Sequence, residues 1–328
     1  MKKKLILMIM IALLSTSVFG EGFAPVGTSV AQFLEIGVGT RATALGGAYT
    51  SMAEGTESVF WNPAGLVDGG KRGDLFASYT QWPADINIGG IALSTDLGAF
   101  GTVTISSVYL MTDEMEVTTT TQPNGTGETF GISNYSIGIS SAHYLTEKIS
   151  VGITAKLVTE DYYDDYGYST WAVDIGTLDG TGYHGLNIGM SILNFAPEVQ
   201  FSGEYLDYSD EQSAPVDSAK AFEKYSLPMN FRFGLSMDIL ENNLHKLTVS
   251  TDMIHPNDNL EQYNMGVEYT FKKMFALRSG YQFTDDSAGL SFGFGLKLSN
   301  FNINYSFASM GKESKLGNVH RYAIILNF

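Results

Sequence analysis

Large apolar side chains alternate with small or polar ones from about Asp74 to the end of the chain. In the stretch Phe301–Phe307, aromatic and aliphatic residues occupy every second position, and Asn or Ser stands between them. Because successive side chains of a strand point to opposite faces, this period of two predicts strands with one apolar face. Fourteen such segments follow one another: 74–83, 86–95, 99–110, 132–143, 149–159, 168–178, 184–194, 229–239, 245–254, 262–272, 274–284, 287–297, 300–309 and 318–328.

The polar face of these strands distinguishes a soluble sandwich from a membrane barrel. It carries mainly Gly, Ser and Asn, and the chain has 36 Gly in 328 residues. A soluble sheet presents charged residues and Thr to water, whereas a transmembrane barrel turns its apolar face to lipid and encloses the polar one. We therefore predict an all-β fold, a transmembrane antiparallel β-barrel of about 14 strands. Because an open sheet edge is not tolerated in hydrocarbon, the last strand must pair with the first.

The connections between the segments alternate in length. Every second connection is long, as at 111–131 and 195–228, and 84–85 and 285–286 are the exceptions. Outer-membrane barrels have short periplasmic turns and longer extracellular loops. This alternation predicts that both chain ends lie on the periplasmic side and that the acidic residues of the long loops face outward.

The first twenty residues have the pattern of a secretory signal peptide. Lys2–Lys4 is basic, Leu5–Leu14 is apolar, and Ser15–Gly20 is rich in small residues. The apolar run is too short to span a bilayer, and an uncleaved anchor is the alternative. The chain is thus divided into a signal peptide at 1–20, an N-terminal segment at 21–73 and a barrel at 74–328. It is predicted to lie in the outer membrane of a Gram-negative-type bacterium, in contact with outer-membrane lipid.

The last strand alternates up to a terminal aromatic residue. This ending resembles the signal that barrel assembly machinery recognises, which makes that machinery an expected partner. The residues that carry the signal are Tyr322, Ile324, Leu326 and Phe328.

Residues 33–67, before the barrel, are rich in Gly and contain three short motifs. They are Gly39-Thr40-Arg41-Ala42, Ala44-Leu45-Gly46-Gly47-Ala48-Tyr49 and Trp61-Asn62-Pro63-Ala64-Gly65-Leu66. The segment resembles the N-terminal motif of the PorV/PorQ family, within the FadL-like group of fourteen-stranded barrels. The resemblance implies that this stretch forms a hatch folded inside the barrel.

The hatch motif is expected to hold the plug in place rather than to bind a ligand. A short helix is predicted near Ser58–Leu66, and Asn62 with Pro63 is predicted to form a turn. The hatch residues singled out are Arg41, Gly46, Gly47, Trp61, Asn62, Pro63, Ala64 and Gly65.

Charged residues also fall on the inward face of the predicted strands. Arg41 is a candidate to pair with their carboxylates. Ion pairs that stiffen the barrel are the favoured interpretation, and a substrate path is the alternative. The candidates are Asp174, Arg232, Asp238, Asp252, Glu268, Arg278, Lys297 and Arg321.

Composition excludes several functions. The net charge of −16 argues against nucleic acid as a partner, and the absence of Cys excludes thiolate metal sites. None of the five His stands at metal-ligand spacing from another. No metal or cofactor is predicted.

No catalytic residues are predicted, although two features near the strand ends contain groups that could react or bind a metal. Ser141 and His143 share a face of one strand near the periplasmic rim, but no orienting acid can be assigned, so an enzyme is not favoured. The acidic run Glu160–Tyr166 offers oxygen ligands for Ca²⁺ but lacks the spacing of a calcium loop.

Three functions remain open. The main hypothesis, implied by the family resemblance, is a component of type IX protein secretion or cell-surface attachment, with secretion-channel components and exported cargo as partners. Aromatic anchors in the loop 195–228 would serve as a contact surface, or would only pack over the barrel mouth. The alternative is a FadL-like transporter of hydrophobic small molecules such as fatty acids, which predicts an apolar pocket between hatch and loops. A purely structural barrel is the third hypothesis.

Overall fold

The structure, a computed structural model, describes residues 26–68, 73–162, 166–206, 219–283, 289–309 and 317–328. The predicted signal peptide at 1–20 lies outside these residues, and its prediction stays open. Among the described residues, no helix is both long enough and apolar enough to cross a membrane.

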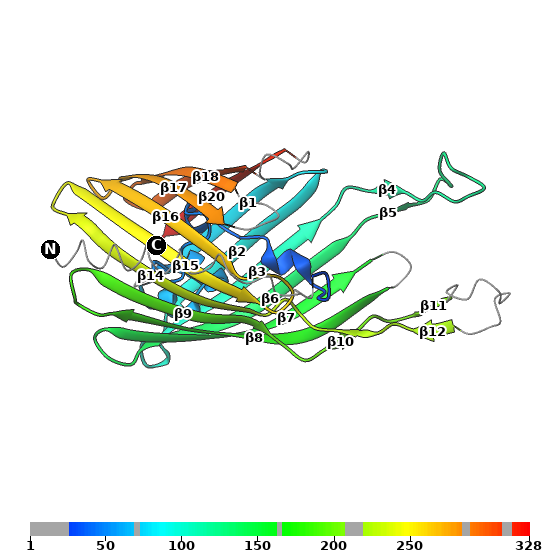
Figure 1. Cartoon of the computed structure of the whole chain (residues 1–328), viewed down its shortest axis with the longest axis horizontal. Coiled ribbons are helices and arrows are strands. Elements are labelled where there is room, and N and C mark those ends of the chain that lie inside the picture. The colour runs from blue at the N-terminus through cyan, green and yellow to red at the C-terminus, as the bar shows by residue number, and fades with distance from the viewer. Residues whose placement is uncertain (1–25, 69–72, 163–165, 207–218, 284–288, 310–316) are drawn as a thin grey trace.

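Fourteen antiparallel strands form one closed barrel, in which each strand pairs with the next along the chain (Figure 1). The last strand pairs with the first and closes the ring. The barrel strands are β1 (Asp74–Trp82), β2 (Ile86–Asp96), β3 (Thr102–Met111), β6 (Ser133–Tyr144), β7 (Ile149–Asp161), β8 (Gly167–Gly180), β9 (Leu186–Phe195), β14 (Asn230–Glu241), β15 (His245–Pro256), β16 (Gln262–Phe271), β17 (Phe275–Phe283), β18 (Gly289–Lys297), β19 (Phe301–Ser309) and β20 (Asn318–Asn327).

The predicted fold is confirmed, and each of the fourteen predicted segments overlaps one barrel strand. The apolar face is the outer one. The outward residues Phe292 and Ile303 are 47% and 41% exposed, whereas the inward Ser291 and Ser306 are 3% and 0% exposed. This arrangement is the reverse of a soluble protein, and it is the one that suits a surrounding bilayer.

The seam between β1 and β20 is held by residues at the very end of the chain. Phe328 donates its backbone N–H to the carbonyl of Gly73 at 3.0 Å, and Asn327 Nδ2 donates to Asp74 Oδ1 at 2.7 Å. A Cβ on Gly73 would lie 2.6 Å from the Phe328 ring, so only glycine leaves room for the terminal aromatic. Phe328 is 62% exposed and remains accessible at the barrel rim.

The two ends of the barrel differ. At one end, here called the turn end, the strands are joined by short turns, one of which contains η5 (Gly98–Phe100). At the other, the loop end, two-stranded ribbons project from the barrel (Figure 1). The ribbons are β4 (Met115–Glu116) with β5 (Thr129–Phe130), β10 (Val199–Gln200) with β13 (Lys224–Tyr225), and β11 (Glu204–Leu206) with β12 (Ala219–Ala221).

Aromatic residues of the long loop 195–228 pack against the neighbouring β7–β8 hairpin. The Phe201 ring lies 5.1 Å from that of Tyr168, and the Phe222 ring lies 5.5 Å from that of Tyr166. Phe195 and Tyr205 stay exposed at 57% and 39%. These contacts favour the packing interpretation for Phe201 and Phe222 and leave the two exposed rings available to a partner. Tyr208 lies outside the described residues.

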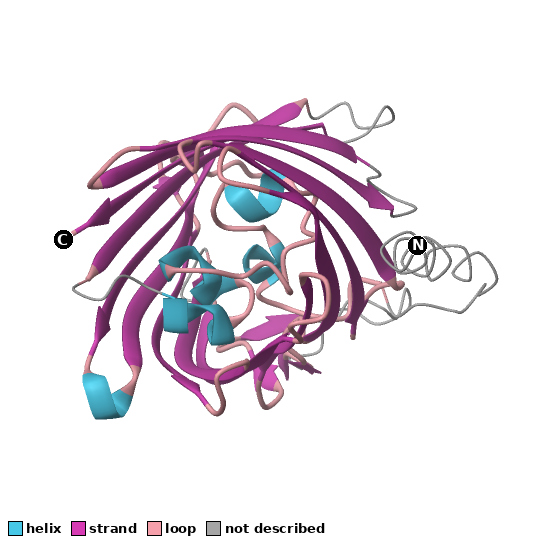
Figure 2. Ribbon diagram, turned by 90° about the vertical axis from the view of Figure 1, so that its left-hand side faces the viewer, coloured by secondary structure: helices cyan, strands magenta, loops and turns pink. Residues whose placement is uncertain are grey.

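Residues 26–68 run through the barrel lumen as the hatch (Figure 2). The hatch contains four short helices: η2 (Gln32–Glu35), α2 (Arg41–Ala44), η3 (Thr56–Phe60) and η4 (Pro63–Asp68). The helix predicted at Ser58–Leu66 is wrong as a single element, because η3 ends before Trp61 and η4 starts at Pro63. Proline has no N–H to donate and its ring disfavours helical geometry in the preceding residue, which accounts for the break.

The hatch passes from one end of the barrel to the other. Near its start, the backbone N–H of Val30 bonds to Ser226 O at the loop end, 3.1 Å away. After it, Gly73 meets the C-terminal Phe328 at the turn end. The C-terminus thus lies at the turn end, as predicted. The N-terminal end of the chain lies outside the described residues, so its predicted position stays open.

Candidate functional site

The barrel wall approaches the hatch backbone at a set of inward-facing glycines. A Cβ on Gly280 would overlap Leu45 and Gly46, and one on Gly189 would overlap Thr50. A Cβ on Gly293 would lie 2.5 Å from the Cβ of Ala44. Because no other residue leaves this space, these positions fix how closely the hatch fits. The glycines in contact with the hatch are Gly90, Gly152, Gly176, Gly189, Gly234, Gly266, Gly280 and Gly293.

Inward-facing serines of five strands donate hydrogen bonds to hatch carbonyls. Ser250 Oγ lies 2.7 Å from Ala48 O, and Ser191 Oγ lies 3.0 Å from Trp61 O. The other pairs are Ser150 with Ala64 O at 3.1 Å, Ser291 with Ala44 O at 3.2 Å and Ser236 with Ser51 O at 3.4 Å. The hatch has little regular structure, so its buried carbonyls need side-chain partners. The Gly and Ser face that the alternation places inside the barrel is therefore largely the surface against which the hatch packs.

Asn62 joins two parts of the hatch to the wall. It is fully buried, and its Nδ2 donates to Thr50 O at 2.9 Å and to Thr177 O of β8 at 3.1 Å. Its Oδ1 accepts the N–H of Ala64 at 3.1 Å. One side chain thus satisfies three backbone groups.

We predict that Asn62→Ala lowers the yield of folded barrel. The substitution removes three hydrogen bonds to backbone groups, two of them buried, and is expected to cost about 2–4 kcal/mol. Heat-modifiable migration on gels measures the folded fraction. Asn87→Ala, which removes one exposed hydrogen bond to Tyr79, should behave as wild type. Equal folded yields for the two variants would contradict the role of Asn62.

The other hatch residues singled out from the sequence lie in the same packed region. Trp61 Nε1 donates to Val38 O at 2.8 Å. Gly46 and Gly47 have φ of 65° and 80°, which favours glycine at this turn. Ala64 is fully buried, and a Cβ on Gly65 would lie 2.5 Å from Ala53 O.

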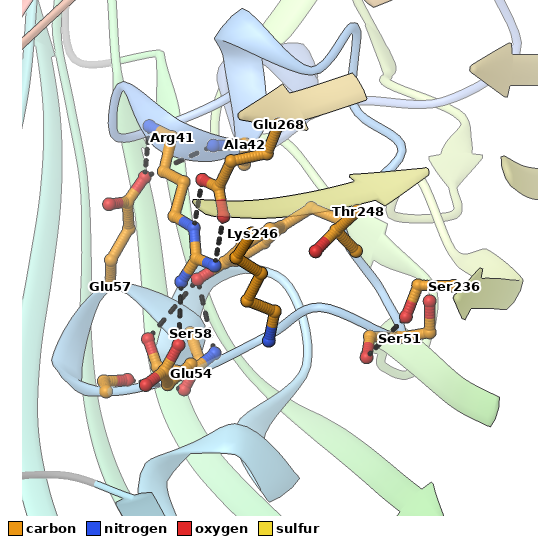
Figure 3. Close-up of polar contacts among 12 residues, drawn as sticks. Arg41, Ala42, Ser51, Glu54, Glu57, Ser58, Ser236, Lys246, Thr248 and Glu268 are labelled. Atoms are coloured by element: carbon orange, nitrogen blue, oxygen red, sulfur yellow. Dashed lines mark hydrogen bonds and ion pairs between the residues drawn. The ribbon is translucent and has the colours of Figure 1, made fainter. Parts of the chain in front are cut away.

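Arg41 is the centre of a charged network between hatch and wall (Figure 3). Its Nε and Nη2 donate to the two carboxylate oxygens of Glu268 at 2.9 and 2.8 Å, and its Nη1 donates to Glu54 at 3.0 Å. Arg278 approaches the same Glu268 carboxylate at 2.7 Å and also donates to Asn304. One wall carboxylate therefore lies between two guanidinium groups, and the expected pairing of Arg41 with a lumen carboxylate is present.

Two glutamates of the hatch have shifted pKa values. Arg41 lowers the pKa of Glu54 below its ordinary value of 4.5. Burial raises the pKa of Glu57, whose Oε1 accepts the backbone N–H of Arg41 at 3.0 Å. Glu57 thus meets the N-terminus of α2, where a carboxylate is favoured by unpaired N–H groups.

The shift at Glu54 predicts a pH-dependent contribution to stability. Because its folded pKa is lowered, Glu54 stabilises the fold above pH 4.5 and loses this contribution as the pH falls through the folded pKa. Its side chain is 60% exposed, so the effect is expected to stay below about 1 kcal/mol. Urea midpoints of wild type and Glu54→Gln should differ at pH 7, and the difference should shrink as the pH falls below 4.5. A difference that stays constant as the solution is acidified would contradict this assignment.

The charged network borders a polar chamber at the turn end of the lumen. The chamber has a volume of about 670 Å³. Its lining includes the predicted residues Asp238, Glu268, Arg278 and Lys297, and Asp238 pairs with Lys246 at 3.2 Å. These side chains suit water and hydrated solutes rather than hydrocarbon.

A second cavity, of about 60 Å³, lies between the hatch and the wall. Its hatch side is mainly apolar, with Phe33, Leu34, Ile36, Val38, Val59, Phe60 and Trp61. Its wall side is mainly polar: Val108 and Leu193 lie among Ser106, Ser136, Thr154, Lys156, Asn194, Asn230 and the predicted Asp174 and Arg232. We call it the loop-end cavity.

The charges beside this cavity are only partly paired. Lys156 lies 2.8 Å from Asp174 and is neutralised by it. The Arg232 guanidinium lies 5.0 Å from the Trp61 ring centre, and its Nε and Nη1 have no hydrogen-bond partner among the described residues. Of the remaining predicted charges, Asp252 accepts the N–H groups of Tyr49 and Thr50 at 3.1 and 2.9 Å, and Arg321 lies over the Trp82 ring.

Glu160 has a role that the sequence did not indicate. It is 2% exposed, and it accepts hydrogen bonds from Ala31 N at 2.9 Å, Asn134 Nδ2 at 3.0 Å and Tyr168 Oη at 2.7 Å. It fastens the start of the hatch to the wall. Residues 163–165 of the acidic run lie outside the described residues, and within the described ones no group of three acidic or His side chains is placed to hold a metal.

The Ser141–His143 pair lies in hydrogen-bond contact, with Oγ and Nε2 3.2 Å apart. Ser141 also lies 3.1 Å from Phe100 O of the η5 turn, so the pair is at the turn end as predicted. In the part of the chain that the structure describes, His143 has no carboxylate partner to orient it for catalysis.

Comparison with known proteins supports the fold. No family model matches the chain, and no curated protein matches its sequence. The CymD monoaromatic hydrocarbon channel matches with a TM-score of 0.60 at 12% identity, over 89% of this chain and 98% of the channel. The Ralstonia pickettii toluene transporter TbuX matches with a TM-score of 0.57 at 11% identity, over 89% and 98%. A Pseudomonas aeruginosa FadL homologue matches with a TM-score of 0.55 at 11% identity, also over 89% and 98%.

At such low identity these matches establish the architecture alone. The chain has the fold of the FadL-type channels, with a closed fourteen-stranded barrel of nearly the same extent. None of the three is a PorV or PorQ protein, so the finer resemblance stays a prediction that rests on the hatch motifs.

Proposed function

We propose that the protein is an outer-membrane channel for hydrophobic small molecules, closed by its hatch. The loop-end cavity carries this proposal, because its hatch side presents apolar side chains inside the barrel, as a FadL-like transporter predicts. Phe33 and Ile36 of the hatch line it together with Val108 and Leu193 of the wall. The lipid-facing outer wall supports a location in the outer membrane. The structural neighbours named as hydrocarbon and toluene channels support the substrate class.

The size of the cavity limits what it accepts at rest. Its volume of about 60 Å³ is less than the roughly 150 Å³ of a protein cavity that holds benzene. Binding of a single aromatic ring or of an alkyl chain therefore requires side chains that line the cavity to move. The large polar chamber at the turn end is a poorer candidate, because charged groups line it on both its hatch side and its wall side and would have to be desolvated.

Ser106→Leu tests the proposal by filling the cavity from the wall. Ser106 faces inward from β3 and lines the cavity, whereas the adjacent Ser107 faces outward between Ile91 and Ile137. We expect Ser106→Leu to weaken binding at least 10-fold, about 1.4 kcal/mol, and Ser107→Leu to leave it unchanged. Fluorescence of Trp61 in a Trp82→Phe, Trp171→Phe background reports binding, with toluene and hexadecanoate tested separately.

Two outcomes would count against this function. If neither probe binds the wild-type protein in detergent, the substrate class is wrong. If a probe binds equally well to Ser106→Leu, the cavity is not its site.

The secretion hypothesis remains a second candidate, favoured by the ribbons that project at the loop end. One ribbon carries an exposed aromatic ring, Tyr205 of β11 at 39%, and Phe195 at the loop end of β9 is 57% exposed; protein interfaces use rings of this kind. A deletion strain separates the two functions. Loss of surface-attached proteins would support secretion, and loss of growth on a hydrophobic carbon source would support transport. A strain with neither defect would leave a structural barrel.

A further inference from the structure

The outer wall of the barrel carries a groove among the described residues. This groove, of about 490 Å³, crosses β16, β17, β18 and β19 on the lipid-facing side, where these strands lie next to one another (Figure 1). Its walls are Val267, Tyr269, Leu277, Phe292, Phe294 and Tyr305. Most of these side chains are substantially exposed, for example Leu277 at 62% and Phe294 at 49%.

The groove forms because one small residue, Ser279, interrupts a row of large outward side chains. Ser279 is the outward residue of β17 that pairs with Val267 on one side and Phe292 on the other. Its outward neighbours along the strand are Leu277 and Tyr281. The floor is backbone at the Arg278–Gly293 pair, and the Arg278 guanidinium points inward to Glu268. The floor therefore presents no charge to the outside.

The polar groups that border the groove already have partners within the protein. Tyr269 Oη lies 2.7 Å from His245 Nδ1, and Tyr305 Oη lies 2.9 Å from His320 Nδ1. Ser279 Oγ lies 3.3 Å from Ser291 O. A ligand with a polar head would find little to bind here, whereas hydrocarbon fits the surface without leaving a buried polar group unpaired.

We propose that this groove binds one acyl chain of a membrane phospholipid. The groove is continuous with the lipid-facing wall, so the occupant comes from the bilayer. The flat rings of Phe292, Phe294 and Tyr305 give it rigid sides. This lipid site is separate from the loop-end cavity and does not depend on the transport function.

Filling the groove should displace the lipid. We expect Ser279→Phe, purified in mild detergent, to retain one phospholipid fewer than wild type in native mass spectra. Ser107→Phe adds the same ring to the lipid-facing wall of β3, away from the groove, and should retain as many as wild type. Equal lipid counts in all three proteins would overturn the proposal.

A second experiment fills the groove after folding, so that it does not depend on how Ser279→Phe folds. The chain has no Cys, so Ser279→Cys and Ser107→Cys each provide a single thiol. Modification of the folded proteins with hexyl methanethiosulfonate should release the bound phospholipid from Ser279→Cys alone. Release from both variants would indicate a general loss of annular lipid, and release from neither would indicate an empty groove. Either result would overturn the proposal.

Discussion

Gly280→Val is expected to loosen the hatch while leaving the barrel closed. The new side chain would occupy the space of Leu45 and Gly46, whose backbone atoms a Cβ at this position already overlaps. The hatch must shift, because the strand itself is held by ladders to β16 and β18. Overpacking of this kind costs about 3 kcal/mol or more when backbone is the obstacle. The shifted hatch should make the pore conductive in planar bilayers and open the segment near Leu45 to protease.

Gly131→Val is the matched control for this prediction. A Cβ on Gly131 meets nothing nearer than 3.8 Å, so its variant should stay non-conductive and protease-resistant. If Gly280→Val is also closed and resistant, the hatch does not rest on the wall in the way the glycines indicate.

Glu268→Ala is expected to have the second large effect. Glu268 has a side chain that is 8% exposed and it accepts hydrogen bonds from both Arg41 and Arg278. Its removal leaves two guanidinium groups close together without their shared acceptor. Removal of one partner from a buried ion pair costs about 3–5 kcal/mol. The urea midpoint should fall accordingly, and the hatch should lose its attachment to β16.

Lys246→Ala provides the contrast in the same chamber. Lys246 pairs with Asp238 but is 47% exposed, so its loss should cost less than about 1 kcal/mol. Similar urea midpoints for Glu268→Ala and Lys246→Ala would show that the Arg41 network contributes little to holding the hatch.

The barrel itself could be predicted from the sequence because its signal is local. Alternation such as that of Phe301–Phe307 needs only the period of a strand, and the contrast between apolar and small residues gives the inside and the outside. The hatch helix was predicted less well. Pro63 divides Ser58–Leu66 into two short helices, and the broken helix still reads as one helical stretch in the sequence.

The function of the inward face could not be predicted from the sequence. Small residues are expected there whether the lumen is filled with water or with a hatch. Gly189 and Ser250 look alike in both cases, and only the fold brings them to Thr50 and Ala48. Ion pairs are equally hard to predict, because their partners lie far apart in the sequence. Arg41 and Glu268 are 227 residues apart, and Glu160 could not be assigned as an anchor for Ala31 from an acidic loop alone.

A single disulfide tests most directly that the hatch lies against the inward face of the wall. Thr43 Oγ1 of the hatch and Ser306 Oγ of β19 lie 2.9 Å apart, so cysteine sulfurs in their place are within reach of a disulfide, while the preceding residue, Tyr305, lines the lipid-facing groove. In this chain without native Cys, Thr43→Cys with Ser306→Cys should cross-link under mild oxidation in native membranes, and Thr43→Cys with Tyr305→Cys should not. Cross-linking of the second pair, or of neither, would contradict the account.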